Sequence, residues 1–233
     1  MNSAPVILSL ETATLGGSIF LARGTTALAK RKGDPKVSHS NSILADINQC
    51  LNDAELKLAD VELFACASGP GSFTGLRIGI ATLKALAATS QRLCVGVPTL
   101  NAIAHSAGTS NATVALLPAG RGEVFAQMFS VSADDVVELD TAAHLSPQRL
   151  IERYGDFSSL VWAGPGADLH RAVLQERAAQ HDSWRLAPQQ TSLAQDVSAL
   201  ALRLFAAGHL QNAESLRAIY VRPSDAELDQ PCQ

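Results

Sequence analysis

Short apolar runs bounded by turn residues alternate along this chain with longer segments of helical periodicity. The runs predict buried or half-buried strands, and the longer segments predict helices. We expect strands at residues 6–11, 18–22, 25–32, 63–67, 94–97, 114–117, 123–129 and 160–163. We expect helices at residues 39–54, 73–89, 147–154, 167–180 and 193–207, with a short helix from Thr99.

The expected elements follow one order twice. A hairpin is followed by helix, strand, helix and strand, and a second hairpin then begins a similar series. Strands that alternate with helices are typical of α/β folds. We therefore expect two α/β lobes, at residues 1–108 and 109–233, with the boundary near Gly108–Asn111.

Composition narrows the class of protein. The 233 residues are 47% hydrophobic and carry a net charge of −4. A protein that grips a nucleic-acid backbone by itself usually has a basic excess, so direct, tight tRNA binding is not expected. None of the four cysteines forms a C-x-x-C pair, which favours reduced thiols and a cytoplasmic location. The start of the chain lacks the pattern of a signal peptide, and the apolar runs are too short for a membrane span.

The first candidate motif is the turn between the first two strands, Glu11-Thr-Ala-Thr-Leu-Gly-Gly-Ser18. Its hydroxyls and backbone N–H groups can bind phosphate, and Glu11 can hold a hydrated Mg²⁺. A plain hairpin turn, with glycines supplying positive φ, explains the same residues and is the favoured interpretation.

The second motif is Ser68-Gly-Pro-Gly-Ser-Phe-Thr-Gly-Leu-Arg77, between a strand and a helix. Gly69 and Gly71 allow close approach of the backbone, and Ser72 can cap the helix. The pattern matches neither the P-loop, nor G-x-G-x-x-G, nor G-x-S-x-G. An anion site at the helix start and a tight packing turn both remain open.

The helix after this motif is apolar on nearly every side, apart from Arg77, Thr82 and Lys84. Such a helix is usually covered on more than one face, either by another helix of the same chain or by another subunit. No histidines are spaced as H-x-x-x-H, so a helical metal pair is not expected.

Several segments together resemble the TsaB (YeaZ) family of the actin-like ATPase, or glycoprotease-like, superfamily. They are Ile7-Leu-Ser-Leu-Glu-Thr-Ala-Thr14, His39-Ser-Asn-Ser-Ile-Leu44, Gly69-Pro-Gly-Ser-Phe-Thr-Gly-Leu-Arg-Ile-Gly79, Gly122-Glu-Val-Phe125 and Ile219-Tyr-Val-Arg222. The glycine-rich segment is shared with the related TsaD family. TsaD-type proteins carry a metal-binding H-x-x-x-H pair that is absent here, which favours TsaB.

The resemblance implies a duplicated actin-like (RNase H-like) α/β fold. It also implies a non-catalytic subunit that pairs with TsaD, with TsaE joining, for threonylcarbamoyl transfer to adenosine 37 of tRNAs that read ANN codons. ATP and metal would then belong to the partner subunits, tRNA would be contacted through the complex, and a homodimer would form without TsaD.

Family subunit contacts use the helices that match residues 39–54 and 73–88. The interface residues expected here are His39, Ile43, Ile47, Phe73, Leu76, Ile80 and Leu83. A vestigial phosphate site is expected at Glu11, Thr12, Thr14, Gly69, Gly71 and Ser72. No catalytic residue, resident metal or cofactor is expected.

Two departures from the family pattern weaken a catalytic role. Glu11 stands where the family usually has Asp, and Pro118 stands where a carboxylate precedes the second hairpin turn. The alternatives are a small-molecule kinase or ATPase of the same fold, which would use Glu11 and the glycine loop, and a glycoprotease-like peptidase.

Overall fold

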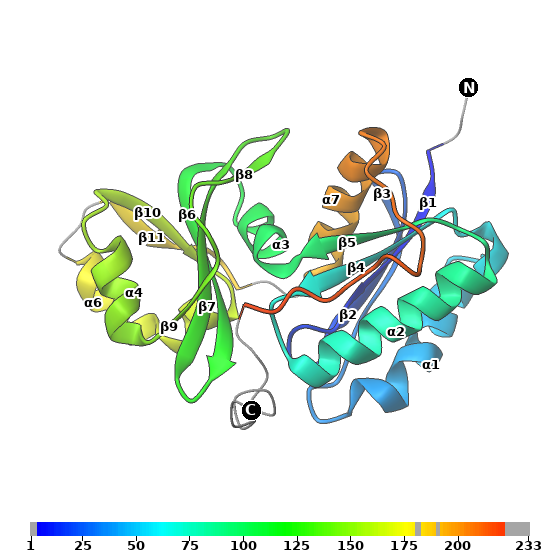
Figure 1. The fold of residues 1–233 in the computed structure, drawn as a ribbon, viewed down its shortest axis with the longest axis horizontal. Helices are drawn as coiled ribbons and strands as arrows, with labels where there is room; N and C mark the ends of the chain where they lie inside the picture. Colours follow the sequence, from blue (N-terminus) through cyan, green and yellow to red (C-terminus); the bar gives the residue numbers. More distant parts are fainter. Residues whose placement is uncertain (1–3, 180–182, 190–191, 222–233) are drawn as a thin grey trace, which may run out of the picture. The chain divides into compact units, whose positions relative to one another are not determined.

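A computed structural model describes residues 4–179, 183–189 and 192–221 of the chain (Figure 1). The described residues form two compact units. The first unit comprises residues 4–102 and 192–218. The second comprises residues 103–179, 183–189 and 219–221. Each unit has its own sheet and its own hydrophobic core.

The sheet of the first unit has five strands in the order β3-β2-β1-β4-β5. They are β1 (Val6–Glu11), β2 (Ser18–Arg23), β3 (Thr26–Lys32), β4 (Leu63–Gly69) and β5 (Cys94–Pro98). The first three strands pair antiparallel, whereas β4 runs parallel to β1 and β5. Both central strands, β1 and β4, are buried along their whole length, which explains their nearly continuous apolar sequences.

Helices cover both faces of this sheet. On one face α1 (His39–Asp53) and α2 (Phe73–Thr89) lie side by side (Figure 1). A short 3-10 helix, η1 (Leu58–Asp60), follows α1 in the sequence. Their inward side chains join Leu8 and Leu10 of β1 in the main core. The other face is covered by α7 (Ala194–Ala206), which packs on β1, β2, β4 and β5.

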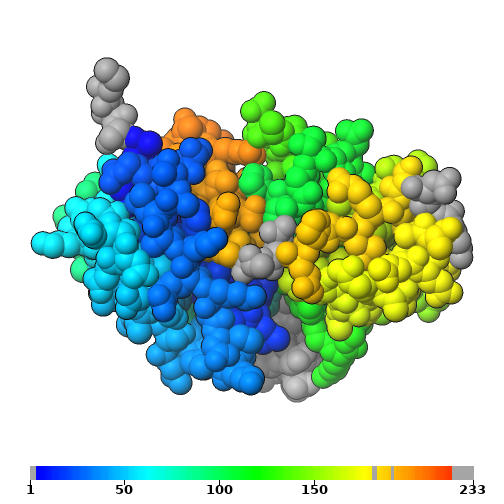
Figure 2. Space-filling view, turned by 180° about the vertical axis from the view of Figure 1, so that it is seen from behind, coloured from blue at the N-terminus to red at the C-terminus, as the bar shows by residue number. Residues whose placement is uncertain are grey.

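The expected division of the chain at residue 108 places α7 in the second lobe, but the structure places it in the first unit. Although α7 is far from the first strands in the sequence, it lies beside them in Figures 1 and 2. Ala194 packs against Phe20 and Ala22, and the Ala194 N–H donates to Ser18 Oγ at 3.0 Å. Ile7 and Ser9 of β1 are fully buried but lie outside the core cluster that contains Leu8 and Leu10, and α7 packs on this strand.

The second unit has a sheet in the order β11-β10-β6-β7-β8, with β9 pairing to β7. Its strands are β6 (Ser110–Gly120), β7 (Glu123–Val131), β8 (Val136–Glu138), β9 (Ala143–Leu145), β10 (Ser159–Ala163) and β11 (Ser183–Leu186). The helices of this part of the chain are α3 (Thr99–Ser106), α4 (Pro147–Tyr154), α5 (Pro165–Leu169) and α6 (Arg171–Ala178). Trp162 anchors the core, edge-on to Trp184 and Tyr154.

The duplicated α/β fold expected from the sequence is confirmed: two mixed sheets are each flanked by helices. The helix expected at 167–180 differs, because the chain turns at His170 (φ −106°, ψ 20°) and separates α5 from α6; residue 180 lies outside the described residues. The short strands β8, β9 and β11 were not expected, since they are too short or too polar to give a period-two pattern. Among the described residues, no helix is both long and apolar enough to cross a membrane.

Candidate functional site

The carboxylate of Glu11 is hydrogen-bonded within the turn between β1 and β2. Glu11 is the last residue of β1 and is only 1% exposed. One oxygen, Oε1, accepts a hydrogen bond from the Thr14 N–H at 2.7 Å, and Oε2 accepts one from the Thr14 hydroxyl at 2.8 Å. The carboxylate therefore organises the turn that the sequence suggested as a phosphate loop.

Burial sets the ionisation of this carboxylate. Desolvation raises the pKa of Glu11 above its ordinary value of 4.5, although the hydrogen bonds from Thr14 act in the opposite direction. The hydrogen-bond donors favour the ionised form of Glu11, whereas the absence of water disfavours it. The effect of desolvation is the larger of the two, so the pKa is raised.

The turn lies directly on α2, where glycines make room for it. A Cβ added to Gly75 would come within 2.0 Å of the Thr12 carbonyl oxygen, and one added to Gly79 within 2.1 Å of Thr12 Oγ1. At Gly71 a Cβ would meet Ala13 Cβ at 2.6 Å. The glycines of the second motif thus let the backbone of the turn touch the helix.

Groups of this chain also occupy the start of α2. Ser72 Oγ caps the helix by accepting from the Gly75 N–H at 3.2 Å, and the Ser72 N–H donates to the Ala13 carbonyl at 2.9 Å. The Gly69 N–H donates to Thr99 Oγ1. The six residues expected to form a phosphate site are therefore close together, but the donors and acceptors described here bind one another.

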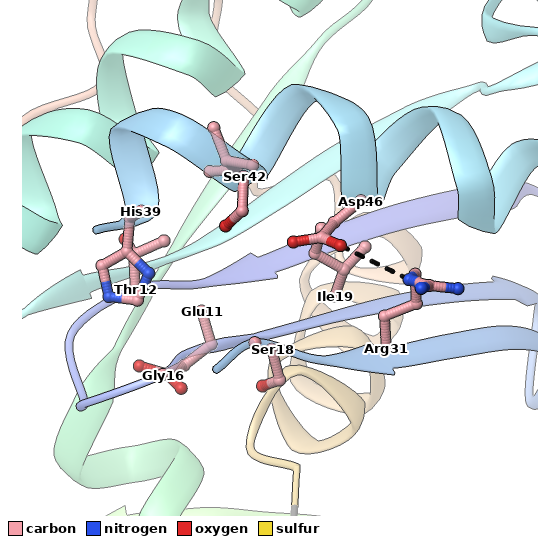
Figure 3. A pocket seen from close by; sticks show the side chains of 11 residues that line it. Glu11, Thr12, Gly16, Ser18, Ile19, Arg31, His39, Ser42 and Asp46 are labelled. Atoms are coloured by element: carbon pink, nitrogen blue, oxygen red, sulfur yellow. Dashed lines mark ion pairs between the residues drawn. The ribbon is translucent and has the colours of Figure 1, made fainter. Parts of the chain in front are cut away.

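A cavity of about 20 Å³ lies beside the turn, between the sheet and α1 (Figure 3). Its lining includes His39, Ser42 and Asp46 of α1, and Arg31 Nε of β3 pairs with Asp46 Oδ1 at 3.4 Å. Glu11 and Ser18 also line it, but Figure 3 shows their side chains directed to the opposite side of the strands. This volume holds about one water molecule, which leaves no room for a nucleotide.

No metal centre is formed by the described residues: they contain no group of three His, Cys, Asp or Glu side chains placed to hold an ion. The buried cysteines are also poor nucleophiles. Desolvation raises the pKa of Cys50 to about 11, and it likewise raises the pKa of Cys66 and Cys94. Cys232 lies outside the described residues.

Most residues expected at the partner interface lie instead in the core of the first unit. The buried ones are Ile43, Ile47, Leu76, Ile80 and Leu83. All but Leu76 belong to the core cluster that α1 and α2 form with β1 and β2, because the apolar side of these strands must be covered. His39 is half-buried and donates from Nε2 to the Thr14 carbonyl at 3.2 Å. Phe73 is 38% exposed.

The outward side of the two helices carries few charges. Its exposed residues on α1 are Ser40, Asn41, Leu44, Ala45, Asn48, Gln49, Asn52 and Asp53. On α2 they are Phe73, Thr74, Arg77, Ala81, Ala85, Ala88 and Thr89. We call these residues the helix-pair face.

Within the helix-pair face, two residues are charged and both have a partner. Asp53 pairs with Arg31 at 3.5 Å, and the Arg77 guanidinium lies 3.7 Å from the centre of the Phe73 ring. Leu44 is 63% exposed. Sequence reasoning missed Leu44, Ala81 and Ala85. A helix that is apolar on nearly every side gives little indication of which side is outward.

We predict that Gly79→Ala destabilises the protein, although Gly→Ala inside a helix otherwise stabilises by about 1 kcal/mol. The new Cβ would meet Thr12 Oγ1. Removing that oxygen with Thr12→Ala should restore tolerance, so a double-mutant cycle by urea unfolding should give a favourable coupling of about 1 kcal/mol or more. Additive effects would contradict close packing of the turn on α2.

We predict that Leu83→Ala lowers the free energy of unfolding by about 2–5 kcal/mol, because Leu83 is fully buried. Leu44→Ala, the same change at an exposed site of the neighbouring helix, should alter it by about 0.5 kcal/mol or less. Denaturant unfolding of both variants provides the measurement. Equal losses would show that the inward and outward sides are assigned wrongly.

We predict that Glu11→Gln becomes more favourable relative to the wild type as pH rises above about 4.5, the ordinary pKa. Since the folded-state pKa is raised, the folded protein binds more protons than the unfolded chain in this window, and wild-type stability falls with rising pH. Glutamine keeps the shape but does not titrate. A stability difference between the two proteins that is constant from pH 4 to pH 8 would contradict the raised pKa.

Comparison with known proteins places this site in a family. The model for the tRNA N6-adenosine threonylcarbamoyltransferase family, TsaD, matches residues 35–219. The tRNA threonylcarbamoyladenosine biosynthesis protein TsaB of Escherichia coli is 29% identical over 222 residues, which cover 93% of this chain and 94% of that protein. TsaB of Bacillus subtilis is 28% identical over 124 residues, 53% of this chain and 54% of that protein.

A solved structure agrees with these relatives. YeaZ from Pseudomonas aeruginosa superposes with a TM-score of 0.75 at 26% identity, covering 93% of this chain and 99% of that one. The matches to TsaB of Escherichia coli and to this YeaZ structure each cover 93% of the chain. This chain therefore belongs to the tRNA N6-adenosine threonylcarbamoyltransferase (TsaD) family and, within it, to the TsaB (YeaZ) group.

Proposed function

We propose that this chain is a non-catalytic subunit of tRNA threonylcarbamoyladenosine synthesis. It pairs with its cognate TsaD and supports threonylcarbamoyl transfer to adenosine 37 of tRNAs that read ANN codons. The observation that carries the proposal is the helix-pair face, in a chain whose relatives are named for this pathway.

The helix-pair face has the composition of an interface core. Charged residues are depleted at the centres of protein interfaces, and aromatic residues and arginine are enriched there. Leu44 and Phe73 supply exposed apolar side chains, while Ala81 and Ala85 leave the α2 surface flat enough for another helix to approach closely.

The geometry of the turn favours a non-catalytic role for this chain over independent catalysis. Both carboxylate oxygens of Glu11 accept hydrogen bonds from Thr14, so the carboxylate is already engaged within the chain. Phosphate-binding groups of an actin-like ATPase would stand here, so we interpret the site as vestigial. ATP and metal then belong to the partner subunits.

The remaining assembly follows from this role. TsaE joins the TsaD-bound complex, tRNA is contacted through the complex, and the protein acts in the cytoplasm, where tRNA is modified. Without TsaD, the helix-pair face is covered by a second copy of the chain. Neither a small-molecule kinase nor a glycoprotease-like peptidase is favoured by a specific feature of the described residues.

The proposal predicts that Ala81→Arg weakens binding to cognate TsaD by about tenfold or more, because a long charged side chain would be buried against the partner. Ala172→Arg makes the same change at an exposed alanine of α6 and serves as the control. Isothermal titration calorimetry with both variants tests this. If Ala81→Arg binds like wild type while folded, the helix-pair face is not the interface.

A further inference from the structure

We propose that Glu11 is a positioning residue: through the turn at residues 12–14 it fixes the starts of α1 and α2 relative to each other, and so sets the shape of the helix-pair face. The consequence for partner binding rests on the proposed function. The coupling between turn and helices does not, because it is a property of the first unit alone.

The first link joins Glu11 to the turn. Its two carboxylate oxygens accept from the backbone N–H and the hydroxyl of Thr14. Hydrogen bonds to a charged acceptor are stronger than neutral ones, and burial from water strengthens them further. The turn therefore has one well-defined conformation for as long as Thr14 remains bonded to Glu11.

The second link joins the turn to α2. Thr12 lies against Gly75 and Gly79, so that neither position has space for a Cβ, and Ala13 accepts from the Ser72 N–H. The contacts extend along the first two turns of α2. A displacement of the turn thus displaces the end of α2 that carries Phe73 and Arg77.

The third link joins the turn to α1. The Thr14 carbonyl accepts from His39 Nε2 at 3.2 Å, and His39 is the first residue of α1. Thr14 therefore contacts Glu11 through its N–H and hydroxyl and contacts α1 through its carbonyl. One residue transmits the position of the buried carboxylate to the helix that carries Leu44.

These links give the buried carboxylate of Glu11 a structural role in the turn. A buried Glu is unfavourable unless its carboxylate is hydrogen-bonded, and Glu11 is only 1% exposed. Its donors come from a three-residue turn that touches both helix starts. We infer that the carboxylate holds the α1 and α2 ends in one register for a partner.

The test replaces Thr14, which is half-buried and outside the apolar core, so that folding is preserved. Thr14→Val removes the hydroxyl while keeping the shape, and Thr14→Ser restores a hydroxyl as the matched control. Hydrogen exchange is measured by mass spectrometry on the isolated full-length protein. We expect Thr14→Val to speed exchange about tenfold in peptides from both helix starts, residues 39–47 and 73–80.

The same experiment includes an internal control and outcomes that would contradict the inference. Exchange in β10 of the second unit should be unchanged, and Thr14→Ser should match wild type throughout. Faster exchange confined to residues 12–17, equal acceleration in β10, or no change in either helix start would each overturn the inference. Restoration by serine distinguishes the hydroxyl contact from a general loss of packing.

A second readout connects the positioning role to the partner. Thr14→Val should bind cognate TsaD about tenfold more weakly than Thr14→Ser does. If wild type does not bind TsaD, the proposed function fails, while hydrogen exchange still decides the positioning role. If TsaD binds both variants equally well despite faster exchange at the helix starts, the claim that Glu11 sets the partner-binding shape is overturned.

Discussion

The close contact between the β1–β2 turn and α2 is the constraint on which the rest of the first unit depends. Thr12 and Ala13 touch the helix at positions where only glycine leaves space, and Glu11 holds the turn in that place from the other side. With α2 fixed at this distance, Ile80 and Leu83 reach the sheet and complete the core with α1. The opposite side of α2 is left flat and almost free of charge.

This single contact also decides what the turn can do. In a phosphate loop, backbone N–H groups and hydroxyls must be free to face a ligand. Here the Thr14 donors bind Glu11, and the Ala13 carbonyl binds the Ser72 N–H. The cavity on the α1 side of the turn is about 20 Å³. The same residues that suggest an ATPase from their order along the chain therefore make contacts with one another and with the start of α2.

Much of this arrangement could be predicted from the sequence. The alternation of apolar runs and helical periods located the strands and helices of the first unit within a few residues, and the glycine-rich motif was correctly placed between β4 and α2. The assignment of α7 to the first unit could not be predicted, because the apolar pattern of a helix does not indicate which of two sheets it packs against.

The side chains of α2 show a second limit. A helix that is apolar on nearly every side gives no amphipathic signal, so Leu76 and Leu83 were taken for interface residues although they are buried in the core. Likewise, Glu11 beside a polar turn predicts a metal or phosphate site as readily as a turn acceptor. Only the distances to Thr14 separate these possibilities.

The central claim is that the helix-pair face joins this chain to a catalytic partner. Size-exclusion chromatography with light scattering of the chain mixed with its cognate TsaD tests it most directly. The account predicts one species whose mass is the sum of one copy of each protein, replacing any homodimer of this chain. Separate elution of the two proteins, with and without TsaE and ATP, would contradict the account and leave the actin-like architecture without the partner role.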